Sequence, residues 1–176
     1  MFDAFALPFQ QAALFGLLTL PVTVWVIYTD VTEMKIKNLA VLAMLAIFLV
    51  AGPFLMPLGE YGTRWLHFAV VLVIGYLLSA TLGFGAGDMK YAAAVAPYVP
   101  VADLRQLAAL FVLWTFALLV MFWAARRSDA LRTAAPGWVW LTATSAEAGG
   151  ARKLKTPFGV ALAPTVTTYF FLAAIA

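Results

Sequence analysis

The sequence predicts an all-α polytopic membrane protein with six transmembrane helices, of which the fourth is short. Of the 176 residues, 65% are hydrophobic and only 11% are charged, a composition far outside the range of soluble domains. The apolar residues form runs close to the length of about 20 residues that crosses a bilayer core of about 30 Å. Because these runs leave no room for a separate soluble domain, we expect residues 1–176 to form a single membrane-embedded domain.

The first three predicted spans cover residues 12–28, 39–55 and 65–82. The first has no basic region before it and no small-residue cleavage site after it, so we interpret it as a retained helix and not as a signal peptide. The second ends in the helix breakers Gly52, Pro53 and Pro57. In the third, Gly75 and Ser79 lie four residues apart, a spacing that lets a neighbouring helix approach closely.

The other three predicted spans cover residues 89–99, 104–125 and 160–176. Pro97 and Pro100 close the fourth, which is too short to cross the bilayer as an upright helix. The fifth is the longest and the most uniformly apolar. A polar stretch, residues 126–156, separates the fifth from the sixth and is predicted to be a loop, with Trp138 and Trp140 at the membrane surface.

The distribution of lysine and arginine predicts the orientation. With six crossings, the loops after the first, third and fifth spans share one side, and they carry Lys35, Lys37, Lys90, Arg126, Arg127, Arg132, Arg152, Lys153 and Lys155. The opposite loops carry Arg64 and Arg105. By the positive-inside rule the basic loops are cytoplasmic and both termini are external. If the fourth segment did not cross the membrane, the loops after it would change sides and the excess of basic residues on one side would disappear. The charge distribution therefore favours a full crossing by this segment despite its short length.

Two acidic residues lie on the predicted cytoplasmic side at the ends of apolar segments. Asp30 follows the run VTVWVIYT, and Asp88 precedes the fourth span. An acid at this depth is costly, which makes it a functional candidate. Two structural alternatives stay open at this point: Asp88 as the N-cap of the fourth helix, and Asp30 as a solvated acid paired with Lys35 or Lys37.

The remaining titratable residues carry no predicted function. We interpret four acids as solvated loop residues: Glu33, Asp103, Asp129 and Glu147. His67 is interpreted as a packed or interfacial histidine. The chain contains no cysteine and one histidine, which argues against thiol chemistry, a Ser/His nucleophile and a metal site, and we expect no cofactor. The formal charge of +3 is too small to predict nucleic-acid binding.

Two facing carboxyl groups have a specific chemical use. Because two like charges a few ångströms apart are costly, such a pair shares one proton near neutral pH. One member then acts as general base on a water molecule while the protonated member polarises a carbonyl group. Asp30 and Asp88 would therefore support hydrolysis of a peptide bond. The glycines at Gly83, Gly85 and Gly87 leave space for an extended substrate backbone.

Three short motifs resemble those of the prepilin peptidases, a family of intramembrane GxGD aspartyl proteases. The first is GxGD itself, with Gly85, Gly87 and Asp88, followed by Met89 and Lys90. The second is the segment after Asp30, which in the family ends in Ile, Pro and Asn; here Ile36 and Asn38 match and Lys37 replaces the proline. The third is KTPFG before the last span, with Lys155, Pro157 and Gly159.

The resemblance implies an endopeptidase that removes the leader from type IV prepilin or pseudopilin precursors at the cytoplasmic membrane of a prokaryote. It implies Asp30 and Asp88 as the catalytic pair, and Gly85, Gly87, Lys90, Asn38, Lys155, Pro157 and Gly159 as residues that shape the site or bind substrate. Pilus assembly machinery is a further expected partner. Larger family members carry a cysteine-rich cytoplasmic domain and methylate the new N-terminus. This chain resembles the short, peptidase-only form of Flp or Tad pili.

Three other interpretations remain open. Archaeal preflagellin peptidases share the architecture. A small proton- or cation-coupled transporter would use the same acids, although it would place them near the bilayer midplane between broken helices. An assembly scaffold without activity would be expected to lack one of the two acids. Cleavage of a candidate prepilin by the purified protein distinguishes the peptidases from the transporter and the scaffold.

Overall fold

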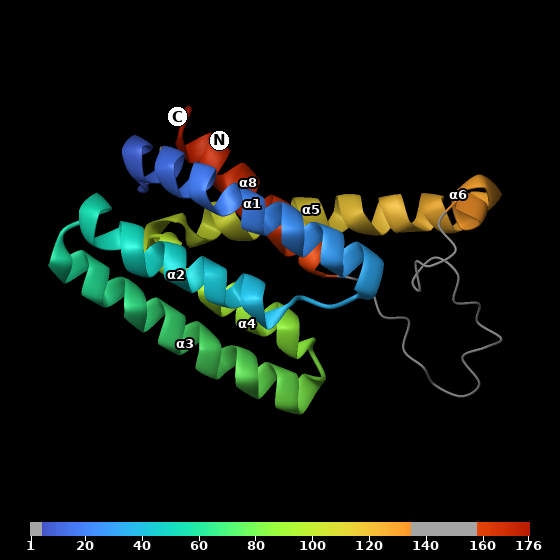
Figure 1. Ribbon diagram of the computed structural model, residues 1–176, viewed down its shortest axis with the longest axis horizontal. Coiled ribbons are helices and arrows are strands. Elements are labelled where there is room, and N and C mark those ends of the chain that lie inside the picture. The colour runs from blue at the N-terminus through green and yellow to red at the C-terminus, as the bar shows by residue number, and fades with distance from the viewer. Residues whose placement is uncertain (1–4, 135–157) are drawn as a thin grey trace.

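A computed structural model describes residues 5–134 and 158–176, and every regular element in these ranges is helical (Figure 1). Four helical segments are long and apolar enough to cross a membrane: α1 (Phe9–Glu33), α2 (Asn38–Leu55), α3 (Leu58–Leu82) and Val101–Ala125, which includes most of α5 (Leu104–Arg126). A shorter apolar helix, α8 (Gly159–Ala173), ends the described chain. The all-α fold is therefore as the composition predicts.

The first and third predicted spans are shorter than the helices that contain them, mainly because the prediction stopped at the first polar residues. The helix α3 begins directly after Pro57, well before the predicted start at Trp65. Its first turns are polar but helical, since Glu60 lies in the first turn and forms an ion pair with Arg64 one turn later. Pro53 lies inside the last turn of α2, which ends at Leu55.

The fourth helix is short. The α-helix α4 (Ala86–Val95) has 10 residues and continues into the 3₁₀ turns η1 (Ala96–Tyr98) and η2 (Val101–Asp103) before α5 begins. It packs against α2, α3 and α8. A Cβ atom at Gly75 of α3 would lie 2.9 Å from the Cβ of Met89, so the two helices touch where Gly75 has no side chain.

The helices alternate in direction along the bundle (Figure 1). The α1–α2 connection, the α3–α4 connection and the end of α5 lie at one end. The α2–α3 turn, the start of α5, the start of α1 and the end of α8 lie at the other. Beyond α5, the short helix α6 (Asp129–Ala134) ends the first described range. The α1–α2 and α3–α4 connections, which carry the predicted site, therefore lie at the same end.

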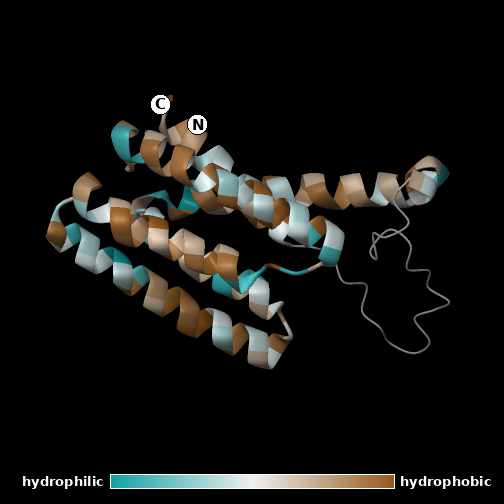
Figure 2. Ribbon diagram, in the orientation of Figure 1, coloured by the Kyte–Doolittle hydropathy of each residue, from teal (hydrophilic) through white to brown (hydrophobic). Residues whose placement is uncertain are grey.

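Hydrophobic residues predominate along the long helices (Figure 2), and many of their large side chains are exposed. On α3, Arg64 and Gly75 are the buried residues, whereas large apolar side chains are exposed, among them Val70, Val73, Ile74 and Leu77. Most of the residues buried in the centre are also apolar, and they include the aromatic side chains Phe15, Phe48, Tyr98 and Phe170, which contact one another edge to face or tilted. A bundle that is apolar inside and outside is suited to lipid.

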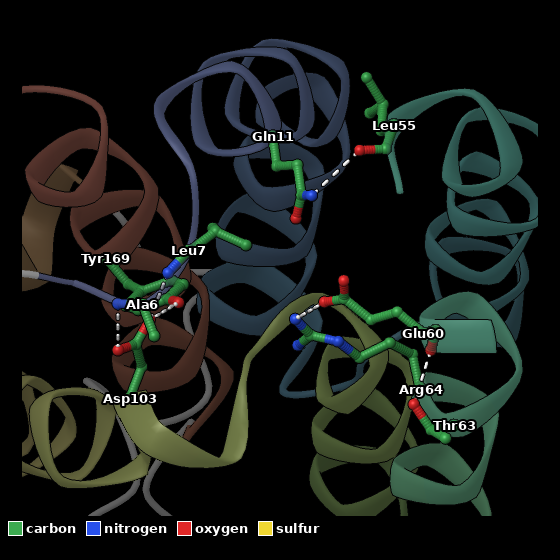
Figure 3. Close-up of polar contacts among 9 residues, drawn as sticks. All are labelled: Ala6, Leu7, Gln11, Leu55, Glu60, Thr63, Arg64, Asp103 and Tyr169. Atoms are coloured by element: carbon green, nitrogen blue, oxygen red, sulfur yellow. Dashed lines mark hydrogen bonds and ion pairs between the residues drawn. The ribbon is translucent and has the colours of Figure 1, made fainter. Parts of the chain in front are cut away.

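Asp103 is buried, which makes its interpretation as a solvated loop acid wrong. Its side chain is 1% exposed and accepts hydrogen bonds from the backbone N–H of Ala6 at 2.7 Å, the N–H of Leu7 at 3.0 Å and the hydroxyl of Tyr169 at 2.7 Å (Figure 3). Three donors replace the water that the carboxylate loses. We call this group of contacts the Asp103 clasp; it connects the segment before α1 to η2 and α8.

Arg64 also lies in a different environment from the predicted one. It was predicted to belong to an external loop, but it lies inside α3, is 4% exposed and donates to Glu60 at 2.7 Å (Figure 3). The pairing with Glu60 compensates part of the cost of burying the guanidinium group. Arg64 is therefore a buried residue of the bundle and is not one of the loop charges that indicate the orientation.

Candidate active site

Asp30 lies in the last turn of α1 and is 3% exposed. Its Oδ2 accepts a hydrogen bond from the backbone N–H of Val160 at 3.1 Å, in the first turn of α8. The free N–H groups of a helix start are natural donors to a carboxylate. Asp30 is therefore oriented by a helix 130 residues away in the sequence and is not a solvated partner of a lysine.

Asp88 occupies the third position of α4, after the N-cap residue Gly85. Because Gly85 holds the N-cap position and Asp88 lies inside the first turn, the interpretation of Asp88 as the N-cap is wrong. Its carboxyl group folds back over Gly85, where a Cβ atom would collide with Oδ2. Burial raises the pKa of Asp88 from 3.8 to about 7, and the charge of Asp30 contributes to the rise. The two carboxyl groups therefore act on each other electrostatically.

Ile36 connects the elements that carry the two acids. A Cβ atom at Gly87, the residue before Asp88, would lie 3.5 Å from the Cβ of Ile36. A Cβ atom at Gly159 would lie 3.0 Å from the Cδ1 of Ile36 and 2.7 Å from the Oδ2 of Asp30. The three motifs identified in the sequence thus meet at one place, and the two glycines allow this close approach.

Two predicted site residues, Asn38 and Lys90, contact each other. Asn38 is the first residue of α2, and its Oδ1 accepts a hydrogen bond from the ammonium group of Lys90 at 3.4 Å. Lys37, which replaces the family proline, has φ −71°, a value that proline also adopts. Its ammonium group pairs with Glu33 at the end of α1. The substitution therefore preserves a proline-like backbone in the α1–α2 connection.

The start of the GxGD segment is attached to α3. Gly83 ends α3 in the left-handed conformation with φ 71°, which favours glycine. The hydroxyl of Ser79 donates to the carbonyl oxygen of Phe84 at 3.0 Å. Ser79 thus contributes a hydrogen bond to this connection, whereas Gly75 provides the close helix contact that its spacing predicted.

Two predicted site residues, Lys155 and Pro157, lie outside the described residues, as do Trp138, Trp140 and most of the predicted loop 126–156. Among the residues that the structure describes, Val160 and Ile36 were not predicted as site residues. The signal for Ile36 was its match to the family motif. Val160 directly follows the KTPFG motif, but its contribution is a backbone N–H, which the side-chain pattern does not reveal.

Comparison with protein families supplies the identification. The model of the type IV leader peptidase family matches residues 17–125, more than half of the chain, and this range includes Asp30 and Asp88. The chain belongs to the type IV leader peptidase family.

Members of the leader peptidase family are aspartic peptidases that act on prepilins. Membership confirms the resemblance found in the sequence and identifies the chain as a multi-pass membrane protein. Comparison with curated proteins and with solved structures gave no match. The third motif, near the start of α8, lies outside the matched range and is related to the leader peptidase site by its contact with Asp30.

Proposed function

We propose that this leader peptidase cleaves Flp-type prepilins at the cytoplasmic membrane face, with Asp30 and Asp88 as its catalytic pair. The observation that supports this most strongly is the convergence of three separate motifs on the two acids. Asp30 contacts the start of α8, and Ile36 packs against both Gly87 and Gly159. Acids of a purely structural role would not require glycines beside both carboxyl groups.

The proposed reaction uses one shared proton. Asp88, with its raised pKa, is the member that holds this proton near neutral pH. The ionised Asp30 accepts a proton from a water molecule, which attacks the scissile carbonyl carbon, while Asp88 donates its proton to the carbonyl oxygen. Collapse of the tetrahedral intermediate breaks the C–N bond: one hydroxyl proton of the intermediate returns to Asp88, and the proton on Asp30 passes to the leaving amine, which restores both acids. The backbone N–H of Val160 orients Asp30 throughout.

The proposed topology has six crossings, with residues 1–176 as one domain and residues 126–156 as a cytoplasmic loop. The described segments support it, because their alternating directions place Lys35, Lys37 and Lys90 at the same end as the two acids (Figure 1). This end is then cytoplasmic and both termini are external. The absence of cysteine in the chain supports the further proposal that it is a peptidase without methyltransferase activity.

The natural absence of cysteine allows a direct test of the orientation. We expect a cysteine introduced at exposed Lys35 to react with a membrane-impermeant maleimide only after inverted membrane vesicles are prepared. A cysteine at Gly59, at the opposite end and with no atom within 4 Å of its Cβ position, is expected to react in intact cells after the outer membrane is permeabilised. The reverse pattern would contradict the proposed orientation.

The activity itself is tested by incubating the purified protein in detergent with a candidate Flp-type prepilin and measuring the masses of the products. We expect one shortened precursor and one leader peptide. The peptide masses locate the cut. Absence of cleavage in detergent and in lipid nanodiscs, for precursors that are processed in cells only when this protein is present, would contradict the proposal.

The raised pKa of Asp88 predicts the pH dependence. A carboxyl group is protonated below its pKa and loses the proton above it, so Asp88 keeps its proton below about pH 7. We therefore expect kcat to decrease about tenfold per pH unit above that value, as the proton donor is lost. Rate measurements from pH 5 to 9 test this, with recovery of activity at pH 6 as the control for unfolding. A rate that is constant up to pH 9 would contradict the assignment of Asp88 as donor.

A further inference from the structure

The short connection between α1 and α2 brings a side chain into the candidate site. It consists of residues 34–37, and it turns sharply because Met34 is in the left-handed conformation with φ 53° and donates its N–H to the carbonyl oxygen of Asp30 at 3.0 Å. The ion pair of Lys37 with Glu33 spans the connection. Ile36 is thereby directed back toward the acids.

The position of Ile36 is defined by its contacts with the two glycines. Its Cδ1 lies 3.0 Å from the point where Gly159 would carry a Cβ atom, and that point is 2.7 Å from the Oδ2 of Asp30. Its Cβ lies 3.5 Å from the corresponding point at Gly87, next to Asp88. The side chain of Ile36 therefore lies between the segments that hold the two carboxyl groups.

This location would bring Ile36 next to a substrate held between the two acids. A scissile carbonyl group within reach of both acids, about 3 Å from each, brings the substrate's neighbouring side chain into the space that Ile36 borders. The packing beside Ile36 is already tight, because a single added carbon at Gly159 would be too close to both Ile36 and Asp30. Isoleucine is stiff at χ1, so its side chain yields less than a flexible one.

Building on the proposed function, we propose that Ile36 determines specificity by limiting the size of the substrate side chain at the cut. Small residues fit beside it, and larger residues collide with its methyl groups. An added methylene in such a space typically changes kcat/KM by about 10- to 200-fold. A purely structural role for Ile36 predicts a different result, namely that its truncation changes the cleavage of all substrates by the same factor.

The test varies the size of the side chain at position 36 of the enzyme together with the size of the substrate side chain at the cut. Two precursor series carry Gly, Ala, Val or Leu, one series immediately before the cut and the other immediately after it. Each is cleaved by the wild type, Ile36→Val and Ile36→Ala. The matched control is Ile74→Ala, because Ile74 has the same side chain but is exposed on α3. Melting temperatures in detergent verify that each variant is folded.

We expect the wild type to discriminate against larger residues by about tenfold or more in one series. Ile36→Ala is expected to raise the kcat/KM ratio of Val to Gly in that series at least about tenfold, Ile36→Val to raise it less, and Ile74→Ala to leave it unchanged. Equal ratios in wild type and both Ile36 variants, or a uniform loss on all substrates, would overturn the proposal. If Ile36→Ala does not fold, the kcat/KM ratio of Val to Gly measured for Ile36→Val tests the proposal in its place.

Failure of this inference is distinguishable from failure of the proposed function. If the wild type cleaves the precursors but the kcat/KM ratios between large and small substrate residues are the same in the Ile36 variants, only the specificity role of Ile36 is overturned. Cleavage that persists when Asp30 or Asp88 is replaced overturns the catalytic pair, and the role of Ile36 beside that pair is overturned with it.

Discussion

Asp30→Asn and Asp88→Asn are each expected to reduce prepilin cleavage by at least about 10³-fold. Each substitution retains the size of the side chain but removes a group that exchanges a proton, and general acid–base catalysis contributes about 10²- to 10⁴-fold for each group. In the proposed mechanism the two carboxyl groups act as a unit, so the double variant is expected to lose little more than either single one. The measurement is kcat/KM on one precursor at pH 6.5.

The control for these substitutions is Asp129→Asn on α6, an acid in the same chain that lies outside the site. Its activity is expected to stay within twofold of the wild type. Membrane levels and melting temperatures of the three variants show whether each is folded. Wild-type rates in either Asp30→Asn or Asp88→Asn would exclude the proposed pair, whatever the result for the double variant.

Gly159→Ala is expected to lower kcat/KM by about 10²-fold. The added methyl group would lie 2.7 Å from the Oδ2 of Asp30 and 3.0 Å from the Cδ1 of Ile36, distances that require one of them to move. Displacement of a catalytic group by about 1 Å commonly costs about this factor. The measurement is steady-state kinetics on the same precursor, in which kcat is expected to decrease more than KM increases.

Gly62→Ala provides a matched control for Gly159→Ala. Gly62 lies in α3, and no atom lies within 4 Å of its Cβ position. The same substitution there is expected to leave activity unchanged and to stabilise the helix by about 0.5–1 kcal/mol. Full activity of Gly159→Ala would contradict the crowded geometry around Asp30.

Much of the fold was predictable from the sequence, because it depends on local patterns. Apolar runs predict helices, and the prolines at 97 and 100 predict the end of the short fourth helix, which the structure confirms. The errors concern polar residues near helix starts. Asp103 and Arg64 were predicted to lie in external loops, yet both are buried. Their burial depends on partners from other parts of the structure, and no local pattern reveals those.

The candidate site was predictable only in part, for a related reason. Loop charges predicted that Asp30 and Asp88 belong to the same end, and the motifs named most of the surrounding residues. The donor to Asp30 is a backbone N–H 130 residues away, and its position depends on how α8 rotates and packs against α1. The sequence carries no signal for such a rotation, because a main-chain donor is the same for every residue except proline.

The candidate site includes a hydrogen-bond donor from α8, the described helix that is synthesised last. The ribosome completes α8 after every other described helix, yet α8 supplies both the N–H that orients Asp30 and the Tyr169 hydroxyl of the Asp103 clasp. Until α8 inserts, α1 lacks the helix with which it packs along its length, and Asp30 lacks its donor. A partly synthesised chain thus already carries both acids but not the hydrogen bond that orients Asp30.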